Sequence, residues 1–271
     1  MSPQIAFLGA GNMASAMISG LIAKGFSPDG IRASDPSEAA LSHLIDAGLT
    51  QVSTSPARIF AGADLVVAAV KPQIIPTALA AINDQLSADT ALLSIAAGIP
   101  IASLKAHTGP DVPVIRCMPN TPAMIGLGAS ALFADETVNE HHRVLAEEVT
   151  NAAGTTVWVE NERLLDAVTA VSGSGPAYFF ALIEAIAKSG TELGLDEEVA
   201  MGLTLQTAMG AAALALKSNE GVATLRENVT SPGGTTEQAL RSLQANQFDR
   251  VINEAVKQCA ARAEALGKEF G

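Results

Sequence analysis

The chain has 271 residues, a formal net charge of −12 and a pI near 4.7, which argues against nucleic acid as a partner because phosphate backbones need a basic face. The same charge disfavours anionic membranes, and no uninterrupted apolar run reaches the roughly 18–20 residues of a membrane span. The N-terminus lacks a basic signal-peptide start, the two cysteines imply no disulfide framework, and the four histidines show no metal-ligand spacing. We therefore expect a cytoplasmic protein that binds no metal, no nucleic acid and no membrane.

The first residues carry a dinucleotide-binding fingerprint. An apolar run over 5–8 leads directly into the sequence GAGNMA at 9–14, a G-x-G-x-x-A pattern. The first glycine permits a tight turn, the second lets a pyrophosphate approach the backbone, and the alanine lets the next helix pack close to the strand. That helix aims its free N–H groups at the phosphates. The cofactor contacts predicted here are Gly9, Gly11, Asn12 and Met13. The alternative is a glycine turn that serves only packing.

Short apolar runs alternate with helical patterns over the first 160 residues, which predicts βαβ units, a parallel sheet and right-handed crossovers. We expect strands at 5–8, 31–34, 65–70, 91–95 and 112–116, with two more at 129–133 and 155–158. Helices are expected at 13–24, 38–47, 73–82, 101–107 and 140–151. The fold class is therefore α/β, with a Rossmann-like dinucleotide-binding domain over residues 1–160.

Strand signals stop after residue 160. Helices are expected at 162–171, 177–193, 197–217, 235–243 and 249–269. The 197–217 segment is apolar on every side and must be covered on every side, which a domain of this size can hardly do alone. We therefore expect a second copy of the chain to cover it, so that 161–271 is an all-helical substrate and dimerisation domain. The alternative is a central helix wrapped by its own neighbours.

Turns after the predicted strands suit a binding rim, because ligands lie outside the carboxyl ends of strands in open α/β sheets. Lys71, within Val70-Lys71-Pro72, would lie along the path of the cofactor; the alternative is a surface lysine. A small-residue turn that contains Ala97 follows the next strand. In the 116–122 segment, two prolines around Asn120 make a rigid rim loop. Cys117 in that segment is expected to be a buried filler, since no His or Asp partner stands in register.

Two stretches rich in small residues interrupt the helical half. Residues 170–177 are expected to form a loop that leaves bare N–H groups at a helix N-terminus. Residues 229–237 place hydroxyls around two glycines before a helix, which suits a small carboxylate. Ordinary capping by Thr235 or Thr236 is the alternative. No catalytic His–Asp pair or twin carboxylates can be recognised. An alcohol substrate needs a positioned acid or base, whereas a protonated imine would need neither.

Five motifs, in this order, closely resemble those of the pyrroline-5-carboxylate reductase family: residues 9–14, 70–72, 116–122, 171–177 and 230–236. The resemblance covers essentially the whole chain, and the last motif is the most specific. It implies that NAD(P)H reduces the cyclic imine Δ1-pyrroline-5-carboxylate to L-proline, the last step of proline biosynthesis. It also implies a helical domain that interlocks in homodimers, often assembled into decamers.

The resemblance further implies roles for single residues. Thr236 would be the catalytic residue that hydrogen-bonds the ring nitrogen, and the substrate carboxylate would be held by Ser231, Gly233, Gly234 and Thr235. Ser172 and Gly173 would also bind substrate. The cofactor would be lined by Val70, Lys71, Pro72, Ala97, Asn120 and Ser174.

The preferred nicotinamide cofactor is left open by the resemblance. Asp35 lies 24 positions after Gly11, near where an acidic residue would accept from the ribose 2′-OH of NAD. Many relatives have Asn-Arg at this place, which suits a 2′-phosphate, whereas this chain has Asp35-Pro36. Ser34 would still bond a phosphate, and whether Arg32 reaches it is open. NADPH is favoured on the habit of the family, with NADH as the alternative.

Two other functions compete. A β-hydroxyacid dehydrogenase carries a catalytic lysine shortly after a glycine-rich loop, and here no lysine follows residues 173–175 before Lys188. A regulator that senses the nicotinamide cofactor without turnover would need no second anion site, whereas residues 231–236 offer one. Both features favour a reductase.

Overall fold

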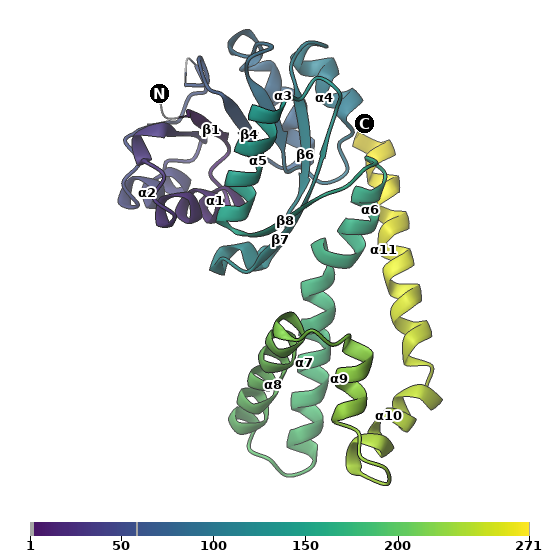
Figure 1. The fold of residues 1–271 in the computed structure, drawn as a ribbon. Coiled ribbons are helices and arrows are strands. Elements are labelled where there is room, and N and C mark those ends of the chain that lie inside the picture. Colours follow the sequence, from purple (N-terminus) through teal and green to yellow (C-terminus); the bar gives the residue numbers. More distant parts are fainter. Residues whose placement is uncertain (1–2, 58, 271) are drawn as a thin grey trace. The chain divides into compact units, whose positions relative to one another are not determined.

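The computed structural model describes residues 3–57 and 59–270, which form two compact units (Figure 1). The sheet unit comprises Met1–Ser174 with Gln258–Gly271, and the helical unit comprises Gly175–Lys257. This grouping follows packing, so residues 161–174 and the end of the last helix pack with the sheet. The expected domain division at residue 160 stays a prediction.

The sheet unit is built on an eight-stranded sheet in the order β3-β2-β1-β4-β5-β6-β7-β8. The strands are β1 Ile5–Leu8, β2 Ile31–Ser34, β3 Gln51–Ser53, β4 Leu65–Ala68, β5 Ala91–Ser94, β6 Val114–Met118, β7 Gly128–Ala134 and β8 Gly154–Trp158. Strands β1 to β6 are parallel, but β7 runs antiparallel to β6 and β8 follows β7 in parallel. The predicted parallel sheet is confirmed for β1 to β6, and β7 runs the other way because a short connection returns the chain without a crossover helix.

Helices cover both faces of the sheet (Figure 1), which is why its strands β1 and β4 are apolar throughout. Helices α1 Asn12–Ala23, α2 Glu38–Asp46 and α5 Glu140–Ala152 cover one face, and α3 Ile75–Ala80 and α4 Ile101–Thr108 cover the other. Within β1, Ile5 and Phe7 belong to the first core and Ala6 and Leu8 to the second. The predicted 73–82 helix is divided into a 3₁₀ turn, Pro72–Ile74, and the short α3.

The remaining elements are helical: α6 Leu164–Val168, a π-helix at Thr169–Gly173, α7 Gly175–Glu192, α8 Glu197–Lys217, α9 Val222–Asn228, α10 Thr235–Ala245 and α11 Phe248–Phe270. Residues 164–192 form one helical run, so the loop expected at 170–177 is wrong: a π-turn takes its place. Both this run and α8 are long and apolar enough to cross a membrane by length and composition, with mean hydropathies of 1.3 and 1.6. Counting uninterrupted apolar runs missed this property, because single polar residues break such runs.

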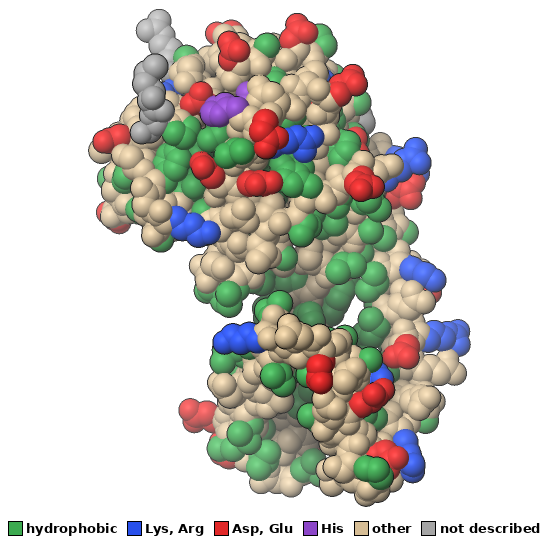
Figure 2. Space-filling view, viewed as in Figure 1, with side chains coloured by type: hydrophobic (Ala, Val, Ile, Leu, Met, Phe, Trp, Pro, Cys, Tyr) green, Lys and Arg blue, Asp and Glu red, His purple; other side chains and the backbone are tan. Residues whose placement is uncertain are grey.

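Most of α8 is exposed within the chain, where only Ala200 and Thr204 of the helix are buried. An apolar groove of about 610 Å³ runs between α7 and α8, with Phe179, Ile186 and Leu203 among its lining residues. Hydrophobic side chains therefore reach the surface of the helical unit (Figure 2). The alternative of a central helix wrapped by its own neighbours is wrong.

Candidate functional site

The glycine turn lies where the strand order reverses, between β1 and β4. Gly9 has φ 101°, and a Cβ there would lie 2.8 Å from the Ala69 carbonyl oxygen and 2.9 Å from Val70 Cγ1. Only glycine fits this turn. Its N–H donates to the Ser34 carbonyl at 2.7 Å, which joins the turn to the end of β2. The crevice at such a reversal is where α/β sheets bind ligands.

Helix α1 begins immediately after this turn with an open N-terminus. Its N-cap is Gly11, its first turn contains no acidic residue, and no side chain of the described residues caps it. Within the same part of the chain, a Cβ on Gly11 would meet nothing within 4 Å. The first-turn N–H groups and the free space above Gly11 fit a pyrophosphate, which supports the roles expected of Asn12 and Met13.

Asp35 reaches back to the glycine turn. Its Oδ2 accepts from the Ala10 N–H and its Oδ1 from the Ser37 N–H, both at 2.9 Å. Each oxygen keeps a lone pair for a ribose hydroxyl. Arg32 donates instead to the Ala61 carbonyl and to Gln4 Oε1, at the amino end of the sheet. Arg32 therefore brings no positive charge to this turn, which answers the question that the sequence left open.

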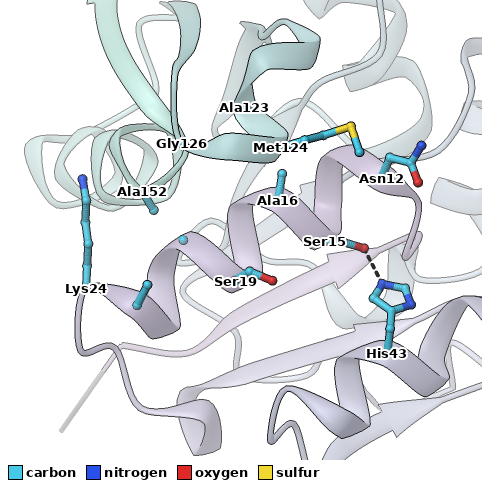
Figure 3. Close-up of a pocket in the computed structure, with 12 residues that line it drawn as sticks. Asn12, Ser15, Ala16, Ser19, Lys24, His43, Ala123, Met124, Gly126 and Ala152 are labelled. Carbon is cyan, nitrogen blue, oxygen red and sulfur yellow. Dashed lines mark hydrogen bonds between the residues drawn. The ribbon is translucent and has the colours of Figure 1, made fainter.

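A groove of about 640 Å³ runs along α1 from Asn12 to Lys24 (Figure 3). His43 of α2 lies beside its first turn, with Nε2 2.6 Å from Ser15 Oγ. Met124 and Ala152 lie across the groove from α1. Sequence reasoning gave His43 no place, because only the packing of α2 beside α1 brings it there.

The turns after β4 and β5 form the next part of the rim. Val70 contacts Gly9, and the exposed Lys71 is the N-cap of the 3₁₀ turn that Pro72 opens. Ala97 is half-buried in the turn after β5. The adjoining Gly98 has φ 78°, and its position packs against the backbone of α11. Lys71 and Ala97 therefore stand at the carboxyl edge, as expected.

Strand β6 leads into Asn120, which is almost fully buried. Its Nδ2 donates to the Ser172 carbonyl at 3.0 Å, and its Oδ1 accepts from the Ala129 N–H at 2.8 Å. Cys117 is 3% exposed, and burial raises the pKa of its thiol to about 12. The thiol is therefore protonated at neutral pH, and the expectation of a buried filler is confirmed.

The π-turn brings Ser172, Gly173 and Ser174 beside this rim. Ser174 N–H donates to the Thr169 carbonyl at 2.8 Å, and Ser172 Oγ donates to the Val168 carbonyl at 3.1 Å. A Cβ on Gly173 would lie 2.4 Å from Met118 Cε, so the turn packs closely on β6. The segment offers no bare helix N-terminus, unlike the expected loop. π-turns of this kind are frequent at functional sites.

A charged network that the sequence did not reveal lies beneath the rim. Arg116 is 9% exposed and its Nη1 lies 2.8 Å from Glu162 Oε1, which also accepts from the Ile101 N–H at 2.8 Å. Burial raises the pKa of the neighbouring Asp166 carboxyl, and Arg116 opposes that shift. A cleft of about 820 Å³ opens beside these groups. Glu162 ties β6 to the start of α4, and no local motif signals a partner 46 residues away.

The hydroxyl-rich loop belongs to the helical unit. Gly234 is the N-cap of α10, and no side chain caps that helix, so the alternative of capping by Thr235 or Thr236 is wrong. Gly233 has φ 73° and its N–H donates to Glu237 Oε2 at 2.8 Å. The two threonines open the first turn, while Ser231 is exposed and its carbonyl accepts from the Gly234 N–H at 2.9 Å. Open first-turn N–H groups fit a small carboxylate.

The structure thus brings two groups of expected residues together within the sheet unit. Gly9, Ser34, Asp35 and Val70 meet at the β1–β4 crevice, and Asn120 meets Ser172 beside β6. Residues 231–236 lie in the helical unit, where they form a group of their own.

Comparisons with known proteins identify the family. The profile described as "Pyrroline-5-carboxylate reductase dimerisation" matches residues 162–266, and that described as "NADP oxidoreductase coenzyme F420-dependent" matches 4–98. A pyrroline-5-carboxylate reductase of Pseudomonas aeruginosa is 46% identical over 270 residues, which cover 100% of this chain and 99% of that protein. The chain belongs to the pyrroline-5-carboxylate reductase family.

Solved structures agree with this assignment. A pyrroline-5-carboxylate reductase from Coxiella burnetii has a TM-score of 0.94 at 36% identity, covering 98% of this chain and 99% of that one. The Plasmodium falciparum pyrroline carboxylate reductase with NADP bound has a TM-score of 0.85 at 29% identity, covering 98% of both. The predicted family, fold class and function as a pyrroline-5-carboxylate reductase are confirmed, and the two competing functions are set aside. The 162–266 match also supports the predicted homodimer.

Proposed function

We propose that the chain binds NADPH along the carboxyl edge of its sheet and reduces Δ1-pyrroline-5-carboxylate to L-proline there, as the last step of proline biosynthesis. The observation that carries this proposal is the Gly9 turn at the β1–β4 reversal, which continues into the uncapped N-terminus of α1. The NADP bound by the Plasmodium falciparum relative supports the phosphorylated cofactor, with NADH as the alternative.

The cofactor site is assigned residue by residue. Gly9, Gly11, Asn12 and Met13 hold the pyrophosphate, because α1 presents open N–H groups there. Ser34 and Asp35 face the adenosine ribose at the end of β2. The nicotinamide is lined by Val70, Lys71, Pro72, Ala97, Asn120 and Ser174.

The bound dinucleotide supplies the hydride. The substrate enters as a protonated imine, whose N–H donates to the hydroxyl of Thr236. The C–H bond that forms at the imine carbon takes both its electrons from the hydride, which NADPH would give up in becoming NADP. The π electrons of the C=N bond return to nitrogen, so no acid or base is required in the step. Ser231, Gly233, Gly234 and Thr235 hold the carboxylate, while Ser172 and Gly173 line the ring. Holding both reactants in this alignment is the main contribution of the chain.

We also place the enzyme in the cytoplasm and its dimers in a decamer. The decamer is supported by the family motifs, and light scattering would give ten times the mass of one chain. The cytoplasm is supported by two free thiols, Cys117 and Cys259, since extracellular proteins more often pair theirs.

One assay tests the function. Absorbance of NADPH is followed in three reactions. The first contains NADPH and pyrroline-5-carboxylate, the second contains NADP and a β-hydroxyacid, and the third contains NADPH without substrate. We expect rapid oxidation with the imine alone. Turnover of the hydroxyacid, or no oxidation with the imine at any pH near neutrality, would contradict the proposal.

A further inference from the structure

A proline stands inside the helical run that carries Ser172, Gly173 and Ser174. The run spans residues 164–192, and Pro176 is the second residue of α7. In an α-helix, the Ser172 carbonyl would accept from the N–H of residue 176. Proline has no N–H, and its ring crowds the carbonyl four residues earlier. The π-turn at Thr169–Gly173 lies where this disturbance falls.

The donor missing from the helix comes from the sheet. Asn120 Nδ2 donates to the Ser172 carbonyl at 3.0 Å, while its Oδ1 accepts from the Ala129 N–H at 2.8 Å. Asn120 is 9% exposed, so little water competes for these bonds. One amide therefore joins the end of β6, the start of β7 and the π-turn. Only an amide at this position provides both a donor and an acceptor in that geometry.

Packing, local bonds and one bond from α11 fix the rest of the turn. Cys259 Sγ donates to Ser174 Oγ at 3.2 Å. Gly173 is pressed against Met118, where a Cβ would lie 2.4 Å from the methyl carbon. Ser172 Oγ and Ser174 N–H bond to carbonyls one turn earlier, at 3.1 and 2.8 Å. The Ser172 carbonyl is thus the group through which the sheet anchors the turn by a side-chain hydrogen bond.

We propose that Asn120 is a positioning residue for the reduction of pyrroline-5-carboxylate: its amide replaces the N–H that Pro176 lacks and so holds Ser172, Gly173 and Ser174 in their working places. This rests on the proposed function, in which those three residues line the substrate and the nicotinamide. The compensation between Asn120 and Pro176 is specific to this arrangement and can be tested as a pair.

The decisive variants are N120D, P176A and their combination. Aspartate keeps an oxygen for the Ala129 N–H but loses the donor, so kcat is expected to fall about 10- to 100-fold. The Kd of NADPH, measured by quenching of the single tryptophan Trp158, is expected to rise by a smaller factor than kcat falls, because the α1 contacts to the pyrophosphate remain and only the nicotinamide end is disturbed. In N120D/P176A, residue 176 again offers an N–H to Ser172, and kcat is expected to recover part of the loss, since the buried carboxylate that N120D introduces remains.

N246D is the matched control. Asn246 Nδ2 also donates to a serine carbonyl, that of Ser242 at 2.8 Å, but on an exposed surface. Its kcat is expected to equal that of the parent chain. Urea unfolding accompanies each variant. If N120D does not fold, N120S with and without P176A is compared instead. The serine side chain is too short for both the Ser172 carbonyl and the Ala129 N–H, and P176A should relieve only the loss at Ser172.

The outcomes separate the two proposals. Parent activity in N120D, or a loss that P176A leaves unrelieved, overturns the positioning role while the reductase assignment stands. The positioning role is also overturned if N120D loses no more kcat than the control N246D does. If the parent chain itself does not oxidise NADPH with the imine, the proposed function fails instead.

Discussion

Single residues decide how the substrate is held, and Thr236 is the most informative of them. It stands in the first turn of α10, which no side chain caps, so its hydroxyl is not needed to cap the helix. We expect Thr236→Ala to lower kcat, because the transition state loses about 1.5–3 kcal/mol of stabilisation. That is the cost of losing a hydrogen bond to a charged group. The Kd of NADPH should hardly change. Thr191→Ala removes a hydroxyl bonded to its own helix, at Ala187, and is the control. Equal kcat/KM in the Thr236 variant and the parent would remove the role.

Asp35 is expected to bias the choice of cofactor. Its carboxylate lies at the glycine turn and Arg32 does not offset it, because Arg32 is engaged at the other end of the sheet. Asp35→Asn should raise the NADPH/NADH ratio of kcat/KM about fivefold, since a negative charge near a 2′-phosphate costs about 1 kcal/mol even in water. The substitution also weakens the glycine turn, but that effect acts on NADPH and NADH alike. A change in the ratio therefore reports the effect of the charge alone. An unchanged ratio would mean that the side chain does not face the ribose. Asp29→Asn on the exposed turn before β2 is the control.

His142 makes stability depend on pH. Burial lowers the pKa of its imidazole below the ordinary 6.5, although the Asp89 carbonyl opposes this. The unfolded chain therefore binds a proton more readily, and folding stability falls as the pH drops below the unfolded pKa toward the folded one. We expect His142→Gln to flatten the decline in unfolding free energy between about pH 7 and about pH 5. Urea titrations followed by Trp158 fluorescence measure it, and an unchanged decline in the His142 variant would contradict the role of this imidazole.

At the scale of elements, α1 uses two glycines for opposite purposes. A Cβ on Gly11 would meet no atom within 4 Å, whereas one on Gly20 would lie 2.2 Å from the Ala152 carbonyl oxygen of α5. Gly20→Ala should therefore lower the free energy of unfolding by about 1–3 kcal/mol through overpacking. Gly11→Ala should lower the melting temperature only slightly, since alanine is a poorer N-cap than glycine, and weaken NADPH binding at least about tenfold, because the methyl group fills the pyrophosphate space. Calorimetry and cofactor titration on both variants check the contrast. Tight NADPH binding by the Gly11 variant would place the phosphates elsewhere.

Elements were predictable where one physical signal was enough. The buried strands β1, β4 and β5 follow from short apolar runs, and α1 follows from its glycine turn. Strand β3 has only three residues and the seven-residue α9 has no clear period, so neither was predicted. The π-turn was predicted as a loop because Gly-Ser-Gly-Pro is typical of loops. The helix persists there since Asn120, some 50 residues earlier, supplies a donor.

The site was predictable where motifs carry it and not where distant residues meet. The glycine turn and the residues after β4, β5 and β6 stand at the sheet edge as expected, because strand order and motif position place them. The bonds of Asp35 to the turn and of Glu162 to Arg116 join residues 25 and 46 positions apart, and no local pattern specifies such pairs. Chemistry can thus be read from residue types, but the positioning network requires the fold.

At the scale of the whole molecule, the helical unit is incomplete by itself. Only two residues of the 21-residue α8 are buried. Leu203 and Met209 are more than half exposed, and Leu205 is half exposed. Leaving this much apolar surface in water is unfavourable, and a match to a dimerisation profile covers the same residues. The apolar character that makes α8 resemble a membrane span is therefore accounted for by burial against a second chain.

Breaking that interface should break the enzyme. Ala208 and Ala212 line the groove between α7 and α8, so a glutamate at either position places an unpaired charge in a surface that the dimer buries. We expect Ala208→Glu and Ala212→Glu to abolish assembly and, with it, activity, because residues 231–236 belong to the unit that the partner chain completes. Ala106→Glu, on the exposed face of α4, should assemble and react like the parent. Light scattering at micromolar protein, together with the NADPH assay, measures both effects. A folded, active monomer of 27.6 kDa in either groove variant would refute the dimer as the working form. Such a monomer would show that residues 231–236 stay in order although no partner chain covers α8.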